Sequence, residues 1–257
     1  MSVKFQILFL DNSFGPWHQL YQEGAFKTWC AFGQDEGQAL TYMGNLPRWP
    51  VAANMLNRIL ISRFIYRYWR HLPLFRNKRD IEITLSQRTL FIDIPELWPY
   101  ISMKTYQAIK FAYESSKFDY LIRANATCYI NYSLLKEFLS TVDKKLCYAG
   151  PIEKGKDFVS GWGIILSRDS IRILMQNHKK FGCGFFDDES IGKIMSENGV
   201  KPISIPFKEL FSEDDAAKIT VKEANQYPMY RMKSFRNGNR NDYEVMQVLH
   251  DRLKDIS

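Results

Sequence analysis

An acidic run in the segment FFDDESIG, which spans Phe185 to Gly192, offers the carboxylates best suited to proton transfer. Asp187, Asp188 and Glu189 lie between a pair of aromatic residues and the expected start of a helix. Amide groups at a helix N-terminus can stabilise such a carboxylate, and in a cleft it can take a proton from a hydroxyl group. An acidic first turn is also a common helix cap, so both interpretations stay open.

A second group of polar side chains follows the hydrophobic stretch in FDYLIRANATCYIN, which starts at Phe118. The expected strand ends close to Arg123, Asn125 and Thr127. Their guanidinium, amide and hydroxyl groups could together hold a phosphate or a sugar. The alternative is a polar turn in which Asn125 bonds to its own backbone.

Two further segments have the composition of ligand sites. In FVSGWGIILSRDS, Gly161 and Trp162 precede an expected strand. Small residues beside an indole allow a sugar ring to stack on it, although a buried tryptophan with packing glycines has the same pattern. Near the end of the chain, four basic residues lie within ten positions: Arg231, Lys233, Arg236 and Arg240. They could neutralise a diphosphate or form an ordinary exposed basic loop.

The elements that would position these residues alternate between strands and helices. Strands are expected over 3–10, 41–43, 90–94, 120–122, 147–149, 163–166 and 202–206. Helices are expected over 17–29, 53–71, 103–115, 133–139, 169–176, with Ser167 as its N-cap, 190–198 and 242–253. This order predicts an α/β fold, a mainly parallel central sheet flanked by helices, with ligands at the carboxyl ends of the strands.

Composition and motifs narrow the class of protein. A chain of 257 residues with 46% hydrophobic and 25% charged residues is neither disordered nor of low complexity, and it fits a single domain over 1–257. The four cysteines form no CxxC pair and lack nearby histidines, so we expect no zinc site or disulfide framework. No P-loop, GxGxxG, HExxH or GxSxG motif occurs, which argues against the enzyme classes that depend on them.

The net charge of +7 favours anionic partners: nucleotide phosphates, acidic glycans, nucleic acid or a lipid surface. The expected helix over 53–71 places Arg63, Arg67 and Arg70 on one face, either a solvated face or a patch that docks at a membrane or an acidic acceptor. The apolar start of the chain is too short for a signal peptide or a membrane span. We therefore expect a cytoplasmic protein, with at most peripheral contact with the inner face of the membrane.

The order of these segments resembles the Fringe and β-1,3-galactosyltransferase-like group of GT-A glycosyltransferases, and more closely its soluble bacterial or viral members. The resemblance covers about Leu90 to Leu253, with a fainter echo at Thr28 and Trp29. It depends on five short motifs in the family's order, which here read Thr28-Trp29, Lys104-Thr105, Asn125-Ala126-Thr127 followed by Tyr129-Ile130-Asn131, Ser160-Gly161-Trp162-Gly163, and Asp187-Asp188 with Gly192.

The resemblance implies an inverting hexosyltransferase that moves a sugar from a nucleotide sugar, expected to be a UDP-sugar, to a glycan or lipid-linked glycan in polysaccharide biosynthesis. Asp188 would be the general base and Asp187 would orient it or the acceptor. Lys104 would lie near the donor, and Gly161 with Trp162 would form part of the sugar-binding wall. The donor half would cover about 1–130 and the acceptor and catalytic half about 131–257.

The departure from the family lies at its metal-binding DxD motif, where this chain has Asn125 and Thr127. Neutral oxygens are poor ligands for Mn²⁺ or Mg²⁺, so dependence on a divalent metal is uncertain. We expect four cations to balance the diphosphate instead: Arg123, Arg231, Lys233 and Arg240. Alternatively, Asp187 or Asp119 supplies one carboxylate to a weakly held ion. Two other functions stay open: a catalytically silent protein that binds nucleotide sugars or glycans, and, with least support, a nucleic-acid-binding protein.

Overall fold

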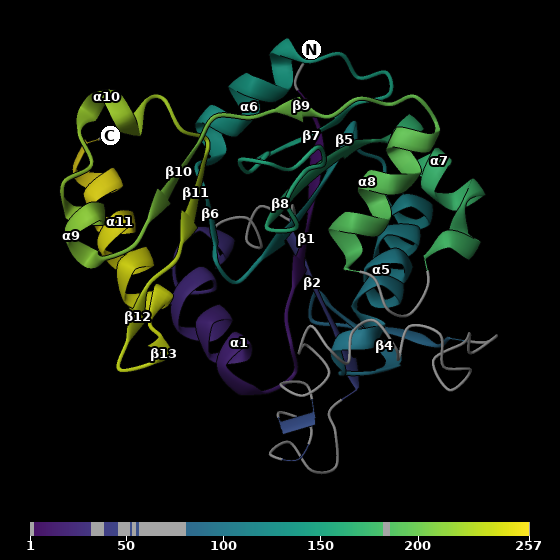
Figure 1. Ribbon diagram of the computed structural model, residues 1–257, viewed down its shortest axis with the longest axis horizontal. Helices are drawn as coiled ribbons and strands as arrows, with labels where there is room; N and C mark the ends of the chain where they lie inside the picture. Colours follow the sequence, from purple (N-terminus) through teal and green to yellow (C-terminus); the bar gives the residue numbers. More distant parts are fainter. Residues whose placement is uncertain are drawn as a thin grey trace.

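The computed structural model describes residues 3–31, 39–45, 52, 55–56, 81–181 and 186–256. The basic helix expected over 53–71 falls, apart from residues 55 and 56, outside the described residues. Cys183 and Phe185 also lie outside them. Within the described part, helices lie on both sides of one large sheet (Figure 1), as the α/β prediction requires.

The large sheet has eight described strands in the order β3-β4-β2-β1-β5-β8-β7-β9. Their bounds are β1 Phe5–Leu10, β2 Ala39–Asn45, β3 Ile83–Ser86, β4 Thr89–Pro95, β5 Tyr120–Asn125, β7 Tyr148–Gly150, β8 Gly163–Ser167 and β9 Ile203–Ser204. The run β4-β2-β1-β5 is parallel, and so is the pair β7-β9, whereas β3 and β8 pair antiparallel with their neighbours. The sheet is thus mixed, with a parallel centre.

Strand β1 lies at the centre of this sheet and is buried on both faces, which explains why it is apolar apart from Gln6. Phe5, Ile7 and Phe9 enter the hydrophobic core on one side of the sheet. Leu8 and Leu10 enter the core on the other side. The carboxyl end of β1 therefore has a fixed position between two packed layers.

The helices form a layer on each side of the sheet (Figure 1). Helices α5 (Ile101–Ser115), α7 (Arg168–Gln176) and α8 (Asp187–Glu197) pack against one another on the side of Leu8. Helix α1 (Gly15–Leu20), a π-helical turn (Tyr21–Ala25), α6 (Tyr132–Thr141), α9 (Glu213–Ala217), α10 (Val221–Ala224) and α11 (Asp242–Ile256) belong to the opposite side. Short 3-10 turns cover Trp98–Tyr100 and His178–Lys180.

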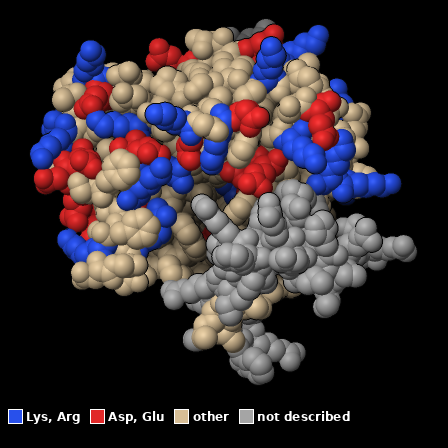
Figure 2. Space-filling view, in the orientation of Figure 1, with Lys and Arg blue, Asp and Glu red and all other residues tan. Residues whose placement is uncertain are grey.

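Smaller sheets complete the side of α11. Strands β10 (Phe207–Leu210), β11 (Met229–Met232) and β6 (Cys128–Ile130) form one of them, and β12 (Phe235–Arg236) with β13 (Asn239–Arg240) forms a hairpin. The sequence did not predict these short strands. Basic and acidic side chains are interspersed over the described part of the face in Figure 2. No helix among the described residues has the length and apolar character of a membrane span.

The starts of α7 and α8 differ in how well they were predicted. Ser167 caps α7 as expected, because its side chain accepts a hydrogen bond from the Ser170 amide. Helix α8 begins at Asp187, three residues before the expected start at 190, and no side chain caps it. Asp187 and Asp188 are therefore fixed in a helical first turn, which limits where their carboxylates can point.

Candidate active site

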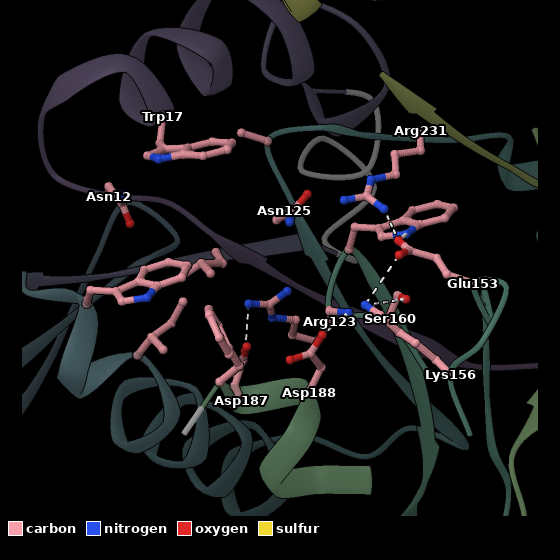
Figure 3. Close-up of a pocket in the computed structure, with 17 residues that line it drawn as sticks. Asn12, Trp17, Arg123, Asn125, Glu153, Lys156, Ser160, Asp187, Asp188 and Arg231 are labelled. Atoms are coloured by element: carbon pink, nitrogen blue, oxygen red, sulfur yellow. Dashed lines mark hydrogen bonds and ion pairs between the residues drawn. The ribbon is translucent and has the colours of Figure 1, made fainter. Parts of the chain in front are cut away.

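A pocket of about 160 Å³ lies at the carboxyl ends of β1 and β5 (Figure 3). This is the edge where ligands bind in parallel α/β sheets. Seven of the residues predicted from the sequence line the pocket: Arg123 and Asn125 of β5, Gly161 and Trp162 before β8, Asp187 and Asp188 of α8, and Arg231 of β11. Segments far apart in the chain thus meet at one place.

Arg123 and Asp187 form a buried ion pair at the base of the pocket. Arg123 Nη2 lies 2.5 Å from Asp187 Oδ2, and the two side chains are 2% and 4% exposed. Thr105 donates a hydrogen bond to the same carboxylate oxygen at 2.8 Å. Arg123 Nε donates to the Tyr42 hydroxyl at 3.2 Å. Asp187 is therefore neutralised and held in place, which suits a positioning group better than a proton acceptor.

Asp188 has a different environment, although it is the next residue in the chain. Its Oδ2 accepts a hydrogen bond from the Gly161 amide at 2.9 Å, and its Oδ1 accepts from the Glu189 amide at 3.0 Å. Burial raises the pKa of Asp188, and the charge of Asp187 raises it further. A carboxylate that lines a pocket and has a raised pKa is suited to accept a proton near neutral pH.

Gly161 is required by this contact. A Cβ atom at position 161 would lie 3.0 Å from Asp188 Oδ2 and 3.2 Å from Asp188 Cβ. The glycine thus lets the backbone amide reach the carboxylate. Both residues line the pocket, so this hydrogen bond is part of its wall.

A charged cluster lies beside Gly161 and Trp162, and of its members the sequence predicted Arg231 but not Glu153 or Lys156. Glu153 forms an ion pair with Arg231 and accepts a hydrogen bond from the Trp162 indole at 3.3 Å. Lys156 Nζ lies 3.3 Å from Glu153 Oε2. The Arg231 guanidinium lies over the Trp162 ring, 5.7 Å from its centre, and Arg231 Nε has no partner among the described residues. The cluster therefore presents two cations beside an indole (Figure 3).

Aromatic side chains missed by the sequence analysis close the rest of the pocket. Trp17 comes from α1. Trp98 packs edge to face against Phe186, with 5.0 Å between the ring centres. Trp17 and Asn12 lie across the pocket from Asp188 in Figure 3. The only sequence signal for Glu153 and Lys156 is their place in a polar loop directly after a strand. Flat aromatic surfaces beside polar groups suit a sugar ring.

Asn125 and Thr127 form a local turn instead of a ligand pair. Asn125 Oδ1 accepts hydrogen bonds from the Thr127 amide at 3.0 Å and the Thr127 hydroxyl at 2.9 Å, which is the polar-turn alternative. Thr127 does not line the pocket. Asp119 precedes β5, at the end of the strand opposite to Asn125, and it pairs with Lys144 at 2.9 Å.

The residues at the DxD position therefore do not fit a divalent metal ion. Such an ion prefers several carboxylate oxygens, but the Asn125 oxygen is engaged by Thr127, and Asp187 is engaged by Arg123. Among the described residues, no group of three or more histidine, cysteine or acidic side chains could hold a metal. We derive no catalytic step from a metal at this site.

Three of the predicted donor-binding cations lie outside the pocket lining. Lys104 is buried, pairs with Glu96 and donates to the Asp11 carbonyl at 3.3 Å. Lys233 pairs with Glu209 at 2.5 Å. The third, Arg240, lines a separate hollow. Each of these cations already has an acidic or backbone partner, a fact that the sequence could not show.

Comparison with known proteins identifies similar solved structures only. No family model matches the chain, and no curated protein matches it significantly. One similar structure is a galactosyltransferase, LgtC, in complex with donor and acceptor sugar analogs, with 10% sequence identity and a TM-score of 0.43. The match covers 98% of this chain and 94% of the LgtC chain. Another is a glycosyltransferase involved in the glycosylation of the major capsid of PBCV-1, with 9% sequence identity and a TM-score of 0.46. That match covers 95% of this chain and 98% of the glycosyltransferase chain.

A third similar structure, the glycosyltransferase GlyE of Streptococcus pneumoniae TIGR4, has 8% identity and a TM-score of 0.43. It covers 98% of this chain and 63% of its own. Because all three identities are at or below 10% and all three TM-scores are below 0.5, the function has to be argued from the pocket itself.

Proposed function

We propose that this chain is a glycosyltransferase that moves a sugar from a nucleotide sugar to a glycan hydroxyl, with Asp188 as the general base. The observation that carries the proposal is the position of Asp188. Its carboxylate has a raised pKa, is held by the Gly161 amide, and lines a pocket with aromatic walls at the carboxyl edge of the sheet. The adjacent carboxylate of Asp187 is neutralised by Arg123, so the two acids have separate roles.

In the proposed reaction, Asp188 takes the proton from the acceptor hydroxyl as its oxygen attacks the anomeric carbon of the donor sugar. The bond from that carbon to the diphosphate oxygen breaks, and the electron pair leaves with the nucleoside diphosphate. In-line attack inverts the anomeric centre. Arg231 and Lys156 line the same pocket, where their charges would balance the leaving diphosphate. NMR of the product tests the anomeric configuration.

The first prediction concerns donor binding and its dependence on metal. UDP, GDP, CMP and dTDP sugars are each added with Mn²⁺, Mg²⁺ or EDTA, and the melting temperature is recorded. We expect one nucleotide to stabilise the protein to the same extent in EDTA, because cations and not a metal balance its charge. Stabilisation that needs Mn²⁺ would contradict the cation-based site. Absence of a shift with every nucleotide would contradict the glycosyltransferase proposal.

The second prediction concerns the base. Asp188→Asn should lower sugar transfer, measured as nucleotide release in the presence of acceptor, by about 10²-fold or more, with donor-induced stabilisation retained. Asp169→Asn is the matched control, since it makes the same change in the first turn of α7, outside the pocket lining. Transfer by Asp188→Asn at the control rate would exclude this base. A wild-type chain that binds donor without turnover would instead be a nucleotide-sugar-binding protein.

A further inference from the structure

A second hollow adjoins the active-site pocket and shares one of its walls. This hollow has a volume of about 610 Å³ and lies between α1, the β12–β13 hairpin and the first turn of α11. Trp17 lines both the hollow and the active-site pocket. A ligand longer than one sugar could therefore pass from one space to the other along the indole.

Neutral amide groups dominate the polar lining of the hollow. Gln19, Asn237, Asn239 and Asn241 all contribute to it. Asn241 is 8% exposed, and its Oδ1 has no hydrogen-bond partner among the described residues, whereas its Nδ2 donates to Glu244 at 3.0 Å. A buried acceptor without a partner costs free energy, and a ligand hydroxyl that reached this oxygen would remove that cost.

The charged groups of the hollow are already matched. Arg236 pairs with Glu244 at 3.1 Å and with Glu213 at 3.4 Å. Arg240 Nε donates to Asp242 at 2.7 Å. Three carboxylates thus offset two cations, so the hollow has no excess positive charge for a phosphate or sulfate, which argues against nucleic acid as the occupant.

Arg240 also shapes the walls of the hollow. Its guanidinium lies 5.1 Å from the centre of the Trp17 ring and 5.0 Å from that of Phe235, so it bridges the two aromatic groups. Trp17, which lines the hollow, is 37% exposed, and Phe235, which lies beside Arg240 outside the lining, is 63% exposed. Exposed rings beside amide groups are suited to bind the apolar faces and the hydroxyl groups of sugars.

We propose that this hollow binds the second and following sugars of a neutral oligosaccharide acceptor, whose terminal sugar occupies the active-site pocket. The inference rests on the proposed function and adds the class of acceptor. The oligosaccharide crosses from the pocket to the hollow along Trp17, which lines both. Asn241 Oδ1 accepts a hydrogen bond from a sugar hydroxyl.

Direct binding tests this inference without turnover. The full chain is applied to a glycan array that carries neutral, sialylated and sulfated chains of one to six sugars. We expect binding to neutral chains that strengthens about tenfold or more from one sugar to two or three. Equal binding of one sugar and longer neutral chains would overturn the proposal. So would binding confined to sialylated or sulfated chains, or no binding to any neutral chain.

Variants locate the binding. Asn241→Ala and Gln19→Ala should each weaken binding of the longer neutral chains, by about tenfold for Asn241→Ala. The control is Gln226→Ala, which changes an exposed glutamine outside the hollow and should bind as wild type. Gln19 is exposed on α1, so its variant tests the hollow even if Asn241→Ala unfolds, as circular dichroism would reveal. Unchanged binding by a folded Asn241→Ala and Gln19→Ala would overturn the assignment.

Turnover separates this inference from the proposed function. For Asn241→Ala we expect nucleotide release from the donor without acceptor to equal that of wild type, and the KM for a trisaccharide acceptor to rise while the KM for the corresponding monosaccharide stays constant. If Asn241→Ala transferred sugar with KM values unchanged for both acceptors, the proposed enzyme activity would stand and the proposed role of the hollow would be overturned. If binding depended on the length of the glycan but the wild-type protein never turned over a donor, the proposed role of the hollow would stand and the proposed enzyme activity would be overturned.

Discussion

Neighbouring residues in this chain differ sharply in the chemistry available to them. Asp187 faces the Arg123 guanidinium and the Thr105 hydroxyl, whereas Asp188 accepts only amide hydrogen bonds in the contacts described. Breaking a buried ion pair leaves an uncompensated charge at a cost of about 3–5 kcal/mol, so the Arg123–Asp187 pair also fixes the start of α8. The acid that orients and the acid that reacts are therefore distinguished by their surroundings and not by residue type.

A pH prediction follows from Asp11, which comes directly after β1 and has a fully buried side chain. Its Oδ2 lies 2.8 Å from His18 Nδ1. Burial raises the pKa of Asp11 from 3.8 to about 6, even with His18 and Lys104 nearby to lower it. Between about pH 4 and 6 the folded protein thus keeps a proton that the unfolded chain has lost, so the free energy of unfolding falls as pH rises through this window.

Asp11→Asn should remove this pH-dependent fall in the free energy of unfolding. A pKa change from 3.8 to about 6 corresponds to about 3 kcal/mol, so the unfolding free energy of wild type should fall by an amount of this order relative to the variant between pH 4 and 6. Urea unfolding at pH 4, 5, 6 and 7 measures the difference. Asp169→Asn, on the surface of α7, is the control. Parallel curves for wild type and Asp11→Asn would show that Asp11 is not the group responsible.

At the scale of elements, helix α8 is the part whose placement decides the site. It carries Asp187 and Asp188 in its first turn, and Gly192, one and a half turns later, allows close packing. A Cβ at position 192 would lie 2.5 Å from Phe158 Cβ and 3.3 Å from the Tyr148 hydroxyl. This glycine therefore sets how closely the helix can approach the loop before β8.

Gly192→Ala should destabilise the protein by about 1–3 kcal/mol, because crowding against Phe158 exceeds the gain in helix propensity. The displaced helix should also lower transfer, since it carries Asp188. Ser196→Ala on the exposed face of the same helix should stay within about 0.5 kcal/mol of wild type. Urea unfolding compares the two, and equal stability of both variants would contradict this account.

The elements also show what a sequence can predict. Strand β1 and helices α5, α7 and α11 were predicted near their observed positions, because a continuous apolar run or a helical period spans each of them. Strands β10 and β11 have four residues each and pair with distant strands, and the hairpin strands β12 and β13 have two residues each, so no local period marks any of them.

The site could be predicted in part for the same physical reasons. Arg123 lies near the carboxyl end of β5, the edge where ligands are expected, whereas Trp162 precedes β8 and reaches that edge because β8 runs antiparallel to β5. Trp17 and Glu153 were missed because only the tertiary fold brings α1 and the loop after β7 to that edge. The pairing of Lys104 with Glu96 and of Lys233 with Glu209 is likewise tertiary, so these cations could not be excluded from the sequence.

At the scale of the whole molecule, one sheet separates two hydrophobic cores. On β5, Leu121 belongs to the core with α5, and Ile122 belongs to the core with α11. Because the central strands β1 and β5 contribute to both cores, we expect the described layers to unfold together. On the described part of the face in Figure 2, basic and acidic side chains are interspersed.

Leu121→Ala and Ile122→Ala test this coupling. Each should lower the free energy of unfolding by about 2–5 kcal/mol, through lost burial and a cavity, and each should shift one common transition. Far-UV and near-UV circular dichroism and tryptophan fluorescence should give coincident urea curves for both variants. If either variant produced a second transition that the other did not, the two layers would be separate folding units.

The position of β1 also has a consequence for synthesis on the ribosome. Phe5 pairs with Tyr120, so the central ladder of the sheet joins residues 115 positions apart. At about 5–20 residues per second, β1 is made roughly 6 to 23 seconds before β5 exists to pair with it. During that interval the apolar segment FQILFL has a free edge that other chains could join, which makes it a natural target for chaperones on the nascent chain.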